Sequence, residues 1–362
     1  MRVLVLLTDA FGGNGGIALY NRDLIAGLCA HPTCEEVVAI PRLMPHPSEP
    51  LPDKLTYVTG GIDGKLRFVA TVVRTVRKNP RFDLIVCGHI NLLPVAYAVQ
   101  RRVSSPLLLE IYGIDAWKPT RSMLSNYLSG KVDAFVSISE VTRRHFLGWS
   151  SVPESRGFVL SNAIHAERYG PGPKSPELLD RYGLRGKTVL LTLGRLESYE
   201  RFKGFDETLE LLPDMAKQIP GISYLIVGDG SDRRRLEKKA TSLGVADRVV
   251  FAGFVSEAEK ADHYRLADVY VMPSSAEGFG FVFLEAMACG VPVIASKQDG
   301  GREALRNGGL GILIDPGNRG ELKRGIIDAL TRPRGTVPDG LEYFSYHNFK
   351  GRLHAIIDRV VQ

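Results

Sequence analysis

The chain alternates short apolar runs with longer segments in which apolar positions recur every three or four residues. The apolar runs, rich in Val, Ile and Leu, predict buried strands, and the amphipathic segments predict helices between them. Strands of this kind between helices predict two parallel sheets, each covered by helices on both faces. The expected strands fall into two groups of six: Val3–Leu7, Val37–Ile40, Leu84–Cys87, Leu107–Ile111, Ala134–Ile138 and Gly157–Leu160, then Val189–Leu193, Ser223–Val227, Val249–Phe251, Val269–Met272, Val291–Ala295 and Gly311–Ile314.

The segment Tyr169–Pro176, rich in Gly and Pro, separates the two groups of strands. For a chain of 362 residues we therefore expect an N-terminal domain over residues 1–168 and a C-terminal domain over residues 177–342. Residues 343–362 predict a terminal helix that returns to the N-terminal domain. Because ligands bind beyond the carboxyl ends of parallel strands, the expected active site is a central cleft between two Rossmann-like, doubly wound domains.

Composition excludes several classes of protein. Charged residues make up 24% of the chain and hydrophobic residues 44%, as in ordinary globular proteins and unlike disordered chains. No run approaches the roughly 18 apolar residues of a membrane span. Met1–Leu7 predicts a buried first strand rather than a signal peptide. The four cysteines are scattered without a zinc spacing or a disulfide pattern, which predicts a reducing, cytoplasmic location.

Positive charge is concentrated in the first half of the chain. Residues 1–165 carry 18 basic and 13 acidic side chains, whereas residues 166–362 carry 28 and 27. Leu66–Arg81 predicts a basic amphipathic helix. Such a helix either lies on an anionic membrane surface or packs against the core and exposes a solvated charged face. Nucleic acid is a poor fit, because no recognition motif occurs and exposed aromatics do not interleave with the basic residues.

The first candidate site is the glycine run Phe11–Gly16, between the first strand and a helix expected from Ile17. Glycines let the backbone approach an anion closely, and a helix N-terminus supplies free N–H groups. The spacing matches neither the dinucleotide fingerprint nor the P-loop. A phosphate contact at Gly15 and Gly16 and a simple strand-to-helix turn therefore both remain open.

The second candidate site is a pair of cations. Arg195 follows the expected strand Val189–Leu193, and Lys203 precedes a helix expected from Phe205. At the rim of a cleft, Arg can hold a phosphate through two parallel hydrogen bonds and Lys can act as a point charge. Two unrelated surface cations are the alternative interpretation.

The third candidate site is the segment Ser274–Gly290, which carries two carboxylates. Glu277 stands in a loop before a glycine, and Glu285 lies about one turn into a helix expected from Phe281. A carboxylate in such a place can accept hydrogen bonds from two sugar hydroxyls. Glu285 interrupts an otherwise apolar face, which makes a capping or solvent-facing role the weaker interpretation.

Together these motifs resemble glycosyltransferase family 4, whose members have the two-domain GT-B fold. Glu277 and Glu285 match the family's E-x7-E pattern, and Arg195 with Lys203 matches its Arg/Lys pair. The resemblance covers nearly the whole chain and is strongest over residues 187–300. Shorter motifs follow in the expected order: Gly15-Gly16, Ser161-Asn162-Ala163, Gly228-Asp229-Gly230 and Gly253-Phe254.

The resemblance implies a role for each matching residue toward a nucleotide-sugar donor. Arg195 and Lys203 bind the diphosphate, Glu277 holds hydroxyls of the donor sugar, and Glu285 holds the ribose. Arg195, Lys203 and Glu277 form the implied catalytic set. The other implied donor contacts are Gly15, Gly16, Tyr112, Asp115, Gly228, Asp229, Gly230, Phe254, Val255, Gly278, Phe279, Gly280 and Phe281.

One segment departs from the family pattern. Many members carry His-Gly-x-Asp where this chain has Tyr112-Gly113-Ile114-Asp115. Tyrosine removes the imidazole, although its hydroxyl can donate to a sugar or phosphate oxygen. His89 and Asn162 are candidates for a polar role in the cleft or toward the acceptor. For His89, a satisfied histidine at a strand end is the alternative.

The function implied by the resemblance is retaining, metal-independent hexosyl transfer from a UDP- or GDP-linked sugar, with no cofactor. The chain contains no Asp-x-Asp sequence, and no carboxylate pair is placed as acid and nucleophile. The expected acceptor is a saccharide or lipid-linked saccharide in cell-surface polysaccharide or glycoconjugate synthesis, bound by the first domain. The expected location is cytoplasmic, with peripheral contact to an anionic membrane surface. The alternatives are a sugar-nucleotide epimerase of the same fold and a non-catalytic sugar-nucleotide binding protein.

Overall fold

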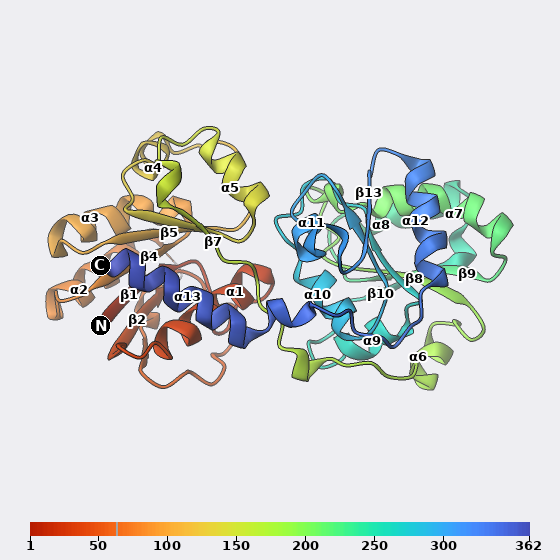
Figure 1. Ribbon diagram of the computed structural model, residues 1–362, viewed down its shortest axis with the longest axis horizontal. Coiled ribbons are helices and arrows are strands. Elements are labelled where there is room, and N and C mark those ends of the chain that lie inside the picture. Colours follow the sequence, from red (N-terminus) through yellow and green to blue (C-terminus); the bar gives the residue numbers. More distant parts are fainter. Residues whose placement is uncertain (63) are drawn as a thin grey trace. The chain divides into compact units, whose positions relative to one another are not determined.

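Each half of the chain builds one parallel β-sheet flanked by helices (Figure 1). The computed structural model describes residues 1–62 and 64–362. These residues form two units: unit 1 contains Met1–Ala163 and Tyr346–Gln362, and unit 2 contains Ile164–Ser345. The first segment of unit 1 ends at Ala163 rather than at residue 168, and Tyr169–Pro176 lies within unit 2.

Unit 1 holds a sheet in the order β3-β2-β1-β4-β5-β6-β7. Strands β4, β5 and β6 are buried along their whole length, as expected for strands covered by helices on both faces. The strands are β1 Arg2–Leu7, β2 Glu36–Pro41, β3 Leu55–Tyr57, β4 Leu84–Gly88, β5 Leu107–Ile111, β6 Ala134–Ser137 and β7 Gly157–Val159. The helices are α1 Gly16–Cys29, α2 Lys65–Lys78, α3 Leu93–Val103, α4 Met123–Ser129, α5 Glu140–Leu147 and α13 Tyr346–Val361.

Unit 2 holds a sheet in the order β10-β9-β8-β11-β12-β13. The strands are β8 Thr188–Leu193, β9 Ile222–Val227, β10 Val249–Gly253, β11 Val269–Met272, β12 Val293–Ser296 and β13 Ile312–Ile314. The helices are α6 Pro176–Arg181, α7 Phe205–Gln218, α8 Arg233–Ser242, α9 Lys260–Leu266, α10 Phe281–Ala288, α11 Gly301–Ala304 and α12 Arg319–Thr331. Short 3₁₀ helices of the two units include η2 Ile90–Leu92, η5 Arg201–Lys203 and η8 Leu341–Phe344.

All twelve predicted strands are confirmed, and the structure adds β3 at the edge of the first sheet. The sequence analysis missed β3 because it spans three residues, Leu55–Tyr57, and carries an exposed Thr56 at its centre. The strand β3 is defined by its backbone pairing with β2 and not by an apolar sequence pattern. An edge strand needs no second buried face, so its sequence leaves a weak signal.

The C-terminal helix α13 lies on α1 of unit 1 (Figure 1). Gly27 of α1 permits the close approach, because a Cβ at that position would lie 2.7 Å from a methyl carbon of Leu353. The ring of Phe349 packs edge-on against Tyr20, with centroids 5.8 Å apart. Helix α13 therefore packs closely on α1, because the glycine of α1 leaves room for the bulky apolar side chains of α13.

Cys29, Cys34, Cys87 and Cys289 are all free and buried. Among the helices built from the described residues, none is both long and apolar enough to cross a membrane.

Candidate active site

The chain order in unit 2 reverses between β8 and β11, which are neighbours in the sheet. Loops leaving two such strands diverge, and doubly wound sheets bind ligands at this switch point. Arg195 follows β8 at once, Lys203 ends η5 in the same loop, and Glu277 lies in the loop after β11. The topology therefore brings together two groups of residues that are separate in the sequence.

Close backbone contacts join these two loops. The amide of Ser275 donates to the carbonyl oxygen of Phe202 at 2.8 Å. Gly204 has a φ of 84°, and a Cβ there would lie 2.5 Å from the carbonyl oxygen of Pro273. Only glycine fits such a conformation and such a contact. The loop that carries Lys203 is thus held against the loop that carries Glu277.

A carboxylate that the sequence analysis did not single out contacts both cations. Glu200 lies at the start of η5, and its side chain is 5% exposed. The guanidinium of Arg195 donates to Oε1 of Glu200, and Nζ of Lys203 lies 2.7 Å from Oε2. The side chain of Arg195 remains 66% exposed, whereas that of Lys203 is 13% exposed. The predicted cation pair is therefore a real cluster, organised around an anion from the same loop.

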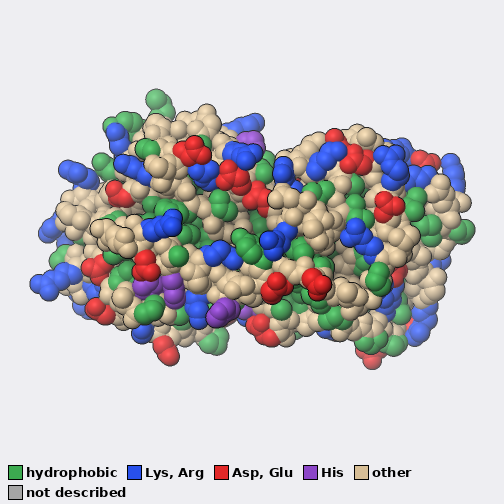
Figure 2. All heavy atoms as spheres, viewed as in Figure 1, with side chains coloured by type: hydrophobic (Ala, Val, Ile, Leu, Met, Phe, Trp, Pro, Cys, Tyr) green, Lys and Arg blue, Asp and Glu red, His purple; other side chains and the backbone are tan. Residues whose placement is uncertain are grey.

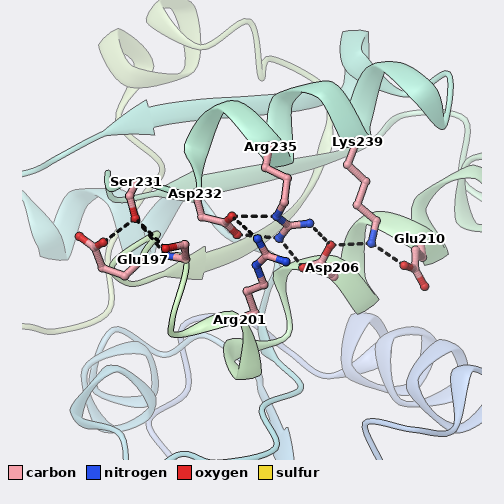
Figure 3. A network of polar contacts seen from close by, with 9 residues as sticks. Glu197, Arg201, Asp206, Glu210, Ser231, Asp232, Arg235 and Lys239 are labelled. Carbon is pink, nitrogen blue, oxygen red and sulfur yellow. Dashed lines mark hydrogen bonds and ion pairs between the residues drawn. The ribbon is translucent and has the colours of Figure 1, made fainter.

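A network of charges anchors this loop to α8 (Figure 3). Arg201 of η5 lies 3.5 Å from a carboxylate oxygen of Asp232. Asp232 in turn pairs with Arg235 at 2.6 Å, and Arg235 pairs with Asp206 of α7 at 2.6 Å. Because Asp232 is buried, these bonds act in a setting of low dielectric constant, where they are stronger than at the surface.

Close backbone packing requires glycine at Gly228 and Gly230, in addition to the donor role predicted for them. A Cβ at Gly228 would lie 1.9 Å from the carbonyl oxygen of Gly194, and one at Gly230 would lie 2.4 Å from that of Leu196. Between them, Asp229 accepts a hydrogen bond from the amide of Gly230 at 2.8 Å. The loop after β9 therefore packs directly on the backbone that presents Arg195.

Phe254 and Val255 follow β10 at the same edge of the sheet. The side chain of Phe254 is 77% exposed. An aromatic ring in this position covers no core, and it can stack on a planar ligand at the cost of little conformational entropy. The geometry is compatible with the predicted contact to a nucleotide base.

A second carboxylate absent from the sequence analysis holds the loop of Glu277. Asp299 is fully buried, and its oxygens accept from Ser274 Oγ at 2.7 Å, the amide of Glu277 at 2.8 Å and the amide of Gly301 at 3.0 Å. Burial raises the pKa of Asp299 to about 7. Its sequence signal was the Asp-Gly-Gly run that follows β12.

Glu277 is half-buried, and its carboxylate accepts from the amide of Gly278 at 3.1 Å. Burial raises the pKa of Glu277, and the neighbouring positive charge of Lys203 opposes this rise. The loops that carry the two side chains are joined by the backbone hydrogen bond from Ser275 to Phe202. Glu277 and Lys203 can therefore act on the same ligand.

Gly278, Phe279 and Gly280 follow Glu277 and can contact a ligand mainly through their backbone atoms. Phe279 is fully buried, and its ring packs against Phe344 with centroids 5.5 Å apart. Gly280 has a φ of 89° and caps α10, which begins at Phe281. The predicted contact of Phe279 with a donor can be made only by its main chain, since its ring belongs to the core.

Glu285 lies inside α10 and is buried. The hydroxyl of Tyr264 donates to its Oε2 at 2.6 Å, and Nζ of Lys260 lies 3.5 Å from its Oε1. Burial lowers the pKa of Lys260, but the carboxylates of Glu285 and Glu257 outweigh this effect and raise it. The structure thus gives Glu285 protein partners in addition to the ribose contact that the sequence predicts.

Unit 1 has its own switch point, between β1 and β4. Gly15 and Gly16 lie exposed where α1 begins, and a Cβ at Gly15 would meet nothing within 4 Å. His89 follows β4, and its Nδ1 accepts from the amide of Asn91 at 3.0 Å, which caps η2. Burial lowers the pKa of His89, and the charge of Arg42 adds to this. The capping bond supports the satisfied strand-end interpretation of His89.

Tyr112 turns its hydroxyl into unit 1. The oxygen lies 2.7 Å from Oδ1 of Asn21, 2.9 Å from Oε2 of Glu110 and 3.0 Å from the carbonyl oxygen of Gly88. Because Asn21 Oδ1 and the carbonyl oxygen of Gly88 can only accept, the single hydroxyl proton is used within this cluster. A hydrogen bond from Tyr112 to a donor, as predicted, would require that proton to leave its buried acceptors.

Asp115 and Asn162 each keep one buried oxygen that accepts no hydrogen bond from the described residues. Burial raises the pKa of Asp115 to about 7. Buried acceptors without a donor are rare in folded proteins, and they mark places where a ligand or water can donate. Both side chains therefore remain suited to the polar roles that the sequence predicts.

Glu110 should make the folding stability of unit 1 decrease as pH rises. Burial raises the pKa of Glu110 to about 8, so its protonated form is favoured in the folded state. This contribution is present at about pH 4 and is lost as pH rises toward about 8. As pH rises between these limits, the wild type should lose about 2–4 kcal/mol of unfolding free energy that the Glu110→Gln variant retains. Melting temperatures of both proteins across this range measure the effect, and parallel curves would contradict it.

Asp299→Ala should destabilise the protein by about 2–4 kcal/mol, because each buried donor left without an acceptor costs about 1–3 kcal/mol. Three donors lose their partner in this variant. Asp315→Ala is the matched control, since Asp315 accepts its hydrogen bonds from Gly317 and Gln298 in an exposed loop. Urea denaturation of both variants measures the difference. Equal, small losses would show that Asp299 does not hold the loop of Glu277.

Comparison with known proteins identifies the family. A family model described as "Glycosyl transferases group 1" matches residues 176–342. A phosphatidyl-myo-inositol mannosyltransferase from Mycobacterium leprae is 30% identical over 278 residues, which cover 75% of this chain and 71% of that protein. The chain belongs to the family of group 1 glycosyl transferases.

Other relatives match a shorter part of the chain. A GDP-mannose-dependent alpha-(1-6)-phosphatidylinositol monomannoside mannosyltransferase from Mycolicibacterium smegmatis is 31% identical over 222 residues, which cover 59% of this chain and 57% of that protein. The counterpart from Mycobacterium tuberculosis is 34% identical over 203 residues, 54% of this chain and 51% of that one. The matched region thus spans a little over half the length of these two relatives.

Solved structures share the whole fold. Alr3699/HepE from Anabaena, in complex with UDP and glucose, has a TM-score of 0.76 at 20% identity and covers 99% of both chains. Sucrose-phosphate synthase from Thermosynechococcus elongatus has a TM-score of 0.71 at 20% identity, with 99% of this chain and 96% of that one covered. The predicted fold class, with two parallel α/β units of the GT-B type, is confirmed.

Proposed function

We propose that this protein is a retaining glycosyltransferase of family 4. It moves a hexosyl group from a nucleotide-sugar to a saccharide or lipid-linked saccharide acceptor. The observation that carries the proposal is the switch point of unit 2, where the β8 and β11 loops gather Arg195, Lys203 and Glu277. Family membership supplies the reaction class, and this geometry supplies a site that can perform it.

In the proposed reaction the bond between the anomeric carbon and the diphosphate oxygen breaks, and a bond to an acceptor hydroxyl oxygen forms. The leaving diphosphate takes the acceptor proton. Arg195 and Lys203 meet the negative charge that develops on the diphosphate, which is electrostatic stabilisation of the transition state. Glu277 accepts hydrogen bonds from donor-sugar hydroxyls, and Glu285 does so from the ribose. No step requires a metal or a cofactor.

A panel of GDP- and UDP-sugars tests this proposal. Two of the relatives above are named for GDP-mannose, and the Anabaena structure holds UDP and glucose, so both bases belong in the panel. A donor at a hundred times its Kd should stabilise the fold by roughly 2.7 kcal/mol. Sugar transfer to added saccharide and lipid-linked acceptors is then measured with each donor that stabilises the protein. The absence of both binding and transfer across the panel would contradict the proposal.

The same panel separates the two alternatives. An epimerase converts the sugar of its donor when no acceptor is present, which NMR of the donor alone detects. A non-catalytic binding protein is stabilised by a donor and transfers nothing to any acceptor. A transferred sugar whose anomeric configuration is inverted would contradict the retaining mechanism.

We also propose an anionic membrane surface as a partner of unit 1, reached from the cytoplasmic side. Helix α2 buries one apolar stripe against the sheet, which includes Phe68, Val72 and Val76. A second stripe, at i, i+3 and i+7, faces outward: Leu66, Val69 and Val73 are exposed, with Leu66 86% exposed. Arg67, Arg74, Arg77 and Lys78 of the same helix are also exposed. Figure 2 shows Lys and Arg side chains along the edge of unit 1 where α2 and α3 lie.

Vesicle flotation tests the membrane proposal. The protein should float with vesicles that contain phosphatidylserine or phosphatidylinositol and much less with neutral vesicles, because each basic residue near the surface contributes about 1 kcal/mol. Arg74→Glu with Lys78→Glu should abolish flotation. The same charge change on α8, Arg234→Glu with Lys238→Glu, is the control. Binding that ignores lipid charge and salt would contradict the proposal.

A further inference from the structure

Glu200 occupies an unusual position in the candidate site, because its carboxylate contacts the two cations assigned to the diphosphate. One oxygen accepts from Arg195, and the other lies 2.7 Å from Nζ of Lys203. With both cations in contact, the cluster carries a net charge of about +1 rather than +2. The anion is thus already present where the phosphates of a donor are expected to bind.

The carboxylate of Glu200 has little freedom to move away. Its side chain is buried, and its backbone is held in the turn of η5, where the amide of Lys203 donates to its carbonyl oxygen at 3.2 Å. The amide of Glu200 donates to the carbonyl oxygen of Glu197 at 2.8 Å. The guanidinium of Arg195, in contrast, is largely exposed and has N–H groups to spare. A bound diphosphate would therefore share the cations with a fixed negative charge.

The charge of the ligand determines how strongly the carboxylate of Glu200 repels it. In a nucleotide-sugar both phosphates are esterified and carry about two negative charges. In a nucleoside diphosphate the terminal phosphate has a second pKa near 6, so it carries almost one more negative charge at pH 7. A fixed carboxylate therefore repels the free diphosphate more than it repels the sugar-bearing donor.

We propose that Glu200 is a resident counter-anion that lowers the affinity of the site for nucleoside diphosphate more than for the donor, and so favours product release. This inference rests on the proposed function, because it takes Arg195 and Lys203 as the cations that bind the diphosphate. Glu200 touches the cations and no reacting atom, so it is a positioning residue. A purely structural role would instead require that its removal loosen Arg195 and Lys203 and weaken binding of both ligands.

Calorimetry on Glu200→Gln distinguishes these roles by the sign of the change. With GDP and UDP as probes, the variant should bind the nucleoside diphosphate about tenfold tighter, and the donor by a smaller factor. Its kcat should fall, because product leaves more slowly, and product inhibition should appear at about tenfold lower concentration. Glu210→Gln is the control, because Glu210 pairs with Lys239 in the network of Figure 3. The affinity of this variant for the nucleoside diphosphate should stay within about twofold of the wild type.

A second pair of variants covers the case in which Glu200→Gln folds poorly. Lys203→Met with Glu200→Gln removes both charges, and it should bind nucleoside diphosphate tighter than Lys203→Met alone. Weaker or unchanged affinity in either comparison would overturn the inference. If the wild type itself binds neither GDP nor UDP nor any donor, the proposed function fails and not merely the role of Glu200.

Discussion

Arg195→Ala should lower kcat/KM for the nucleotide-sugar donor tenfold to more than a hundredfold and leave the fold nearly as stable as the wild type. A hydrogen bond to a charged group is worth about 1.5–3 kcal/mol, which corresponds to this range. The fold should tolerate the change because the side chain of Arg195 is largely exposed and its partner Glu200 keeps the Lys203 ammonium. Donor kinetics beside a urea denaturation curve give both quantities.

Lys203→Ala should behave differently, and the contrast is informative. Lys203 is mostly buried, and its loss leaves the buried carboxylate of Glu200 with the exposed Arg195 alone. Removing one partner of a buried ion pair is strongly destabilising, by about 3–5 kcal/mol where both charges are fully buried. Lys203→Ala should therefore lose stability as well as donor use. Arg234→Ala, an exposed arginine on α8, serves as the control. Full activity of Arg195→Ala on every accepted donor would show that the diphosphate binds elsewhere.

Glu277→Gln should lower the rate of sugar transfer tenfold to more than a hundredfold, while the affinity for free nucleoside diphosphate changes little. Glu277 lies ahead of α10, in the loop that the amide of Ser275 joins to the loop of Lys203. Gln keeps the shape of the side chain but not its charge, so the loss measures charge-assisted hydrogen bonds to sugar hydroxyls, about 1.5–3 kcal/mol. Calorimetry with the diphosphate and transfer kinetics with the donor separate the two effects.

Glu285→Gln should weaken both steps, because the ribose is common to donor and product. It should also lower the melting temperature, since the buried Glu285 accepts from Tyr264 and faces the charge of Lys260. Glu210→Gln controls for the loss of one negative charge on unit 2. Equal loss of diphosphate affinity in the Glu277 and Glu285 variants would show that the two carboxylates do not divide sugar and ribose between them.

Much of the site was accessible from the sequence, since its motifs lie at the ends of strongly apolar strands. Arg195 and Glu277 each follow a strand whose Val- and Leu-rich pattern is easily recognised, and polar residues at strand ends predict a site. Glu200 and Asp299 escaped because their role depends on contacts across loops. Asp299 binds the amide of Glu277 at a separation of 22 residues, and only the order of strands brings the two together.

The role predicted for Tyr112 illustrates the limit in another way. The motif placed a hydroxyl at the end of β5, but a motif does not state which way a side chain turns. Asn21 and Glu110 form buried acceptors on the inner side, and the hydroxyl of Tyr112 lies against them. A polar group that is buried must find a partner within the protein, and this requirement decided its direction.

The sequence by itself determined the two parallel sheets and the helices between their strands, because hydrophobic periodicity is a local property. The family resemblance rested on short motifs, namely the pair Glu277 and Glu285 and the cations Arg195 and Lys203. The tertiary structure alone decided which loops meet. The neighbourhood of β8 and β11 joins Arg195 and Lys203 to Glu277, and the close packing of backbone at Gly204 and Gly228 holds their loops together. Contacts between residues far apart in the chain follow from strand order and from the volume that side chains fill, and neither is recorded in the pattern of any one segment.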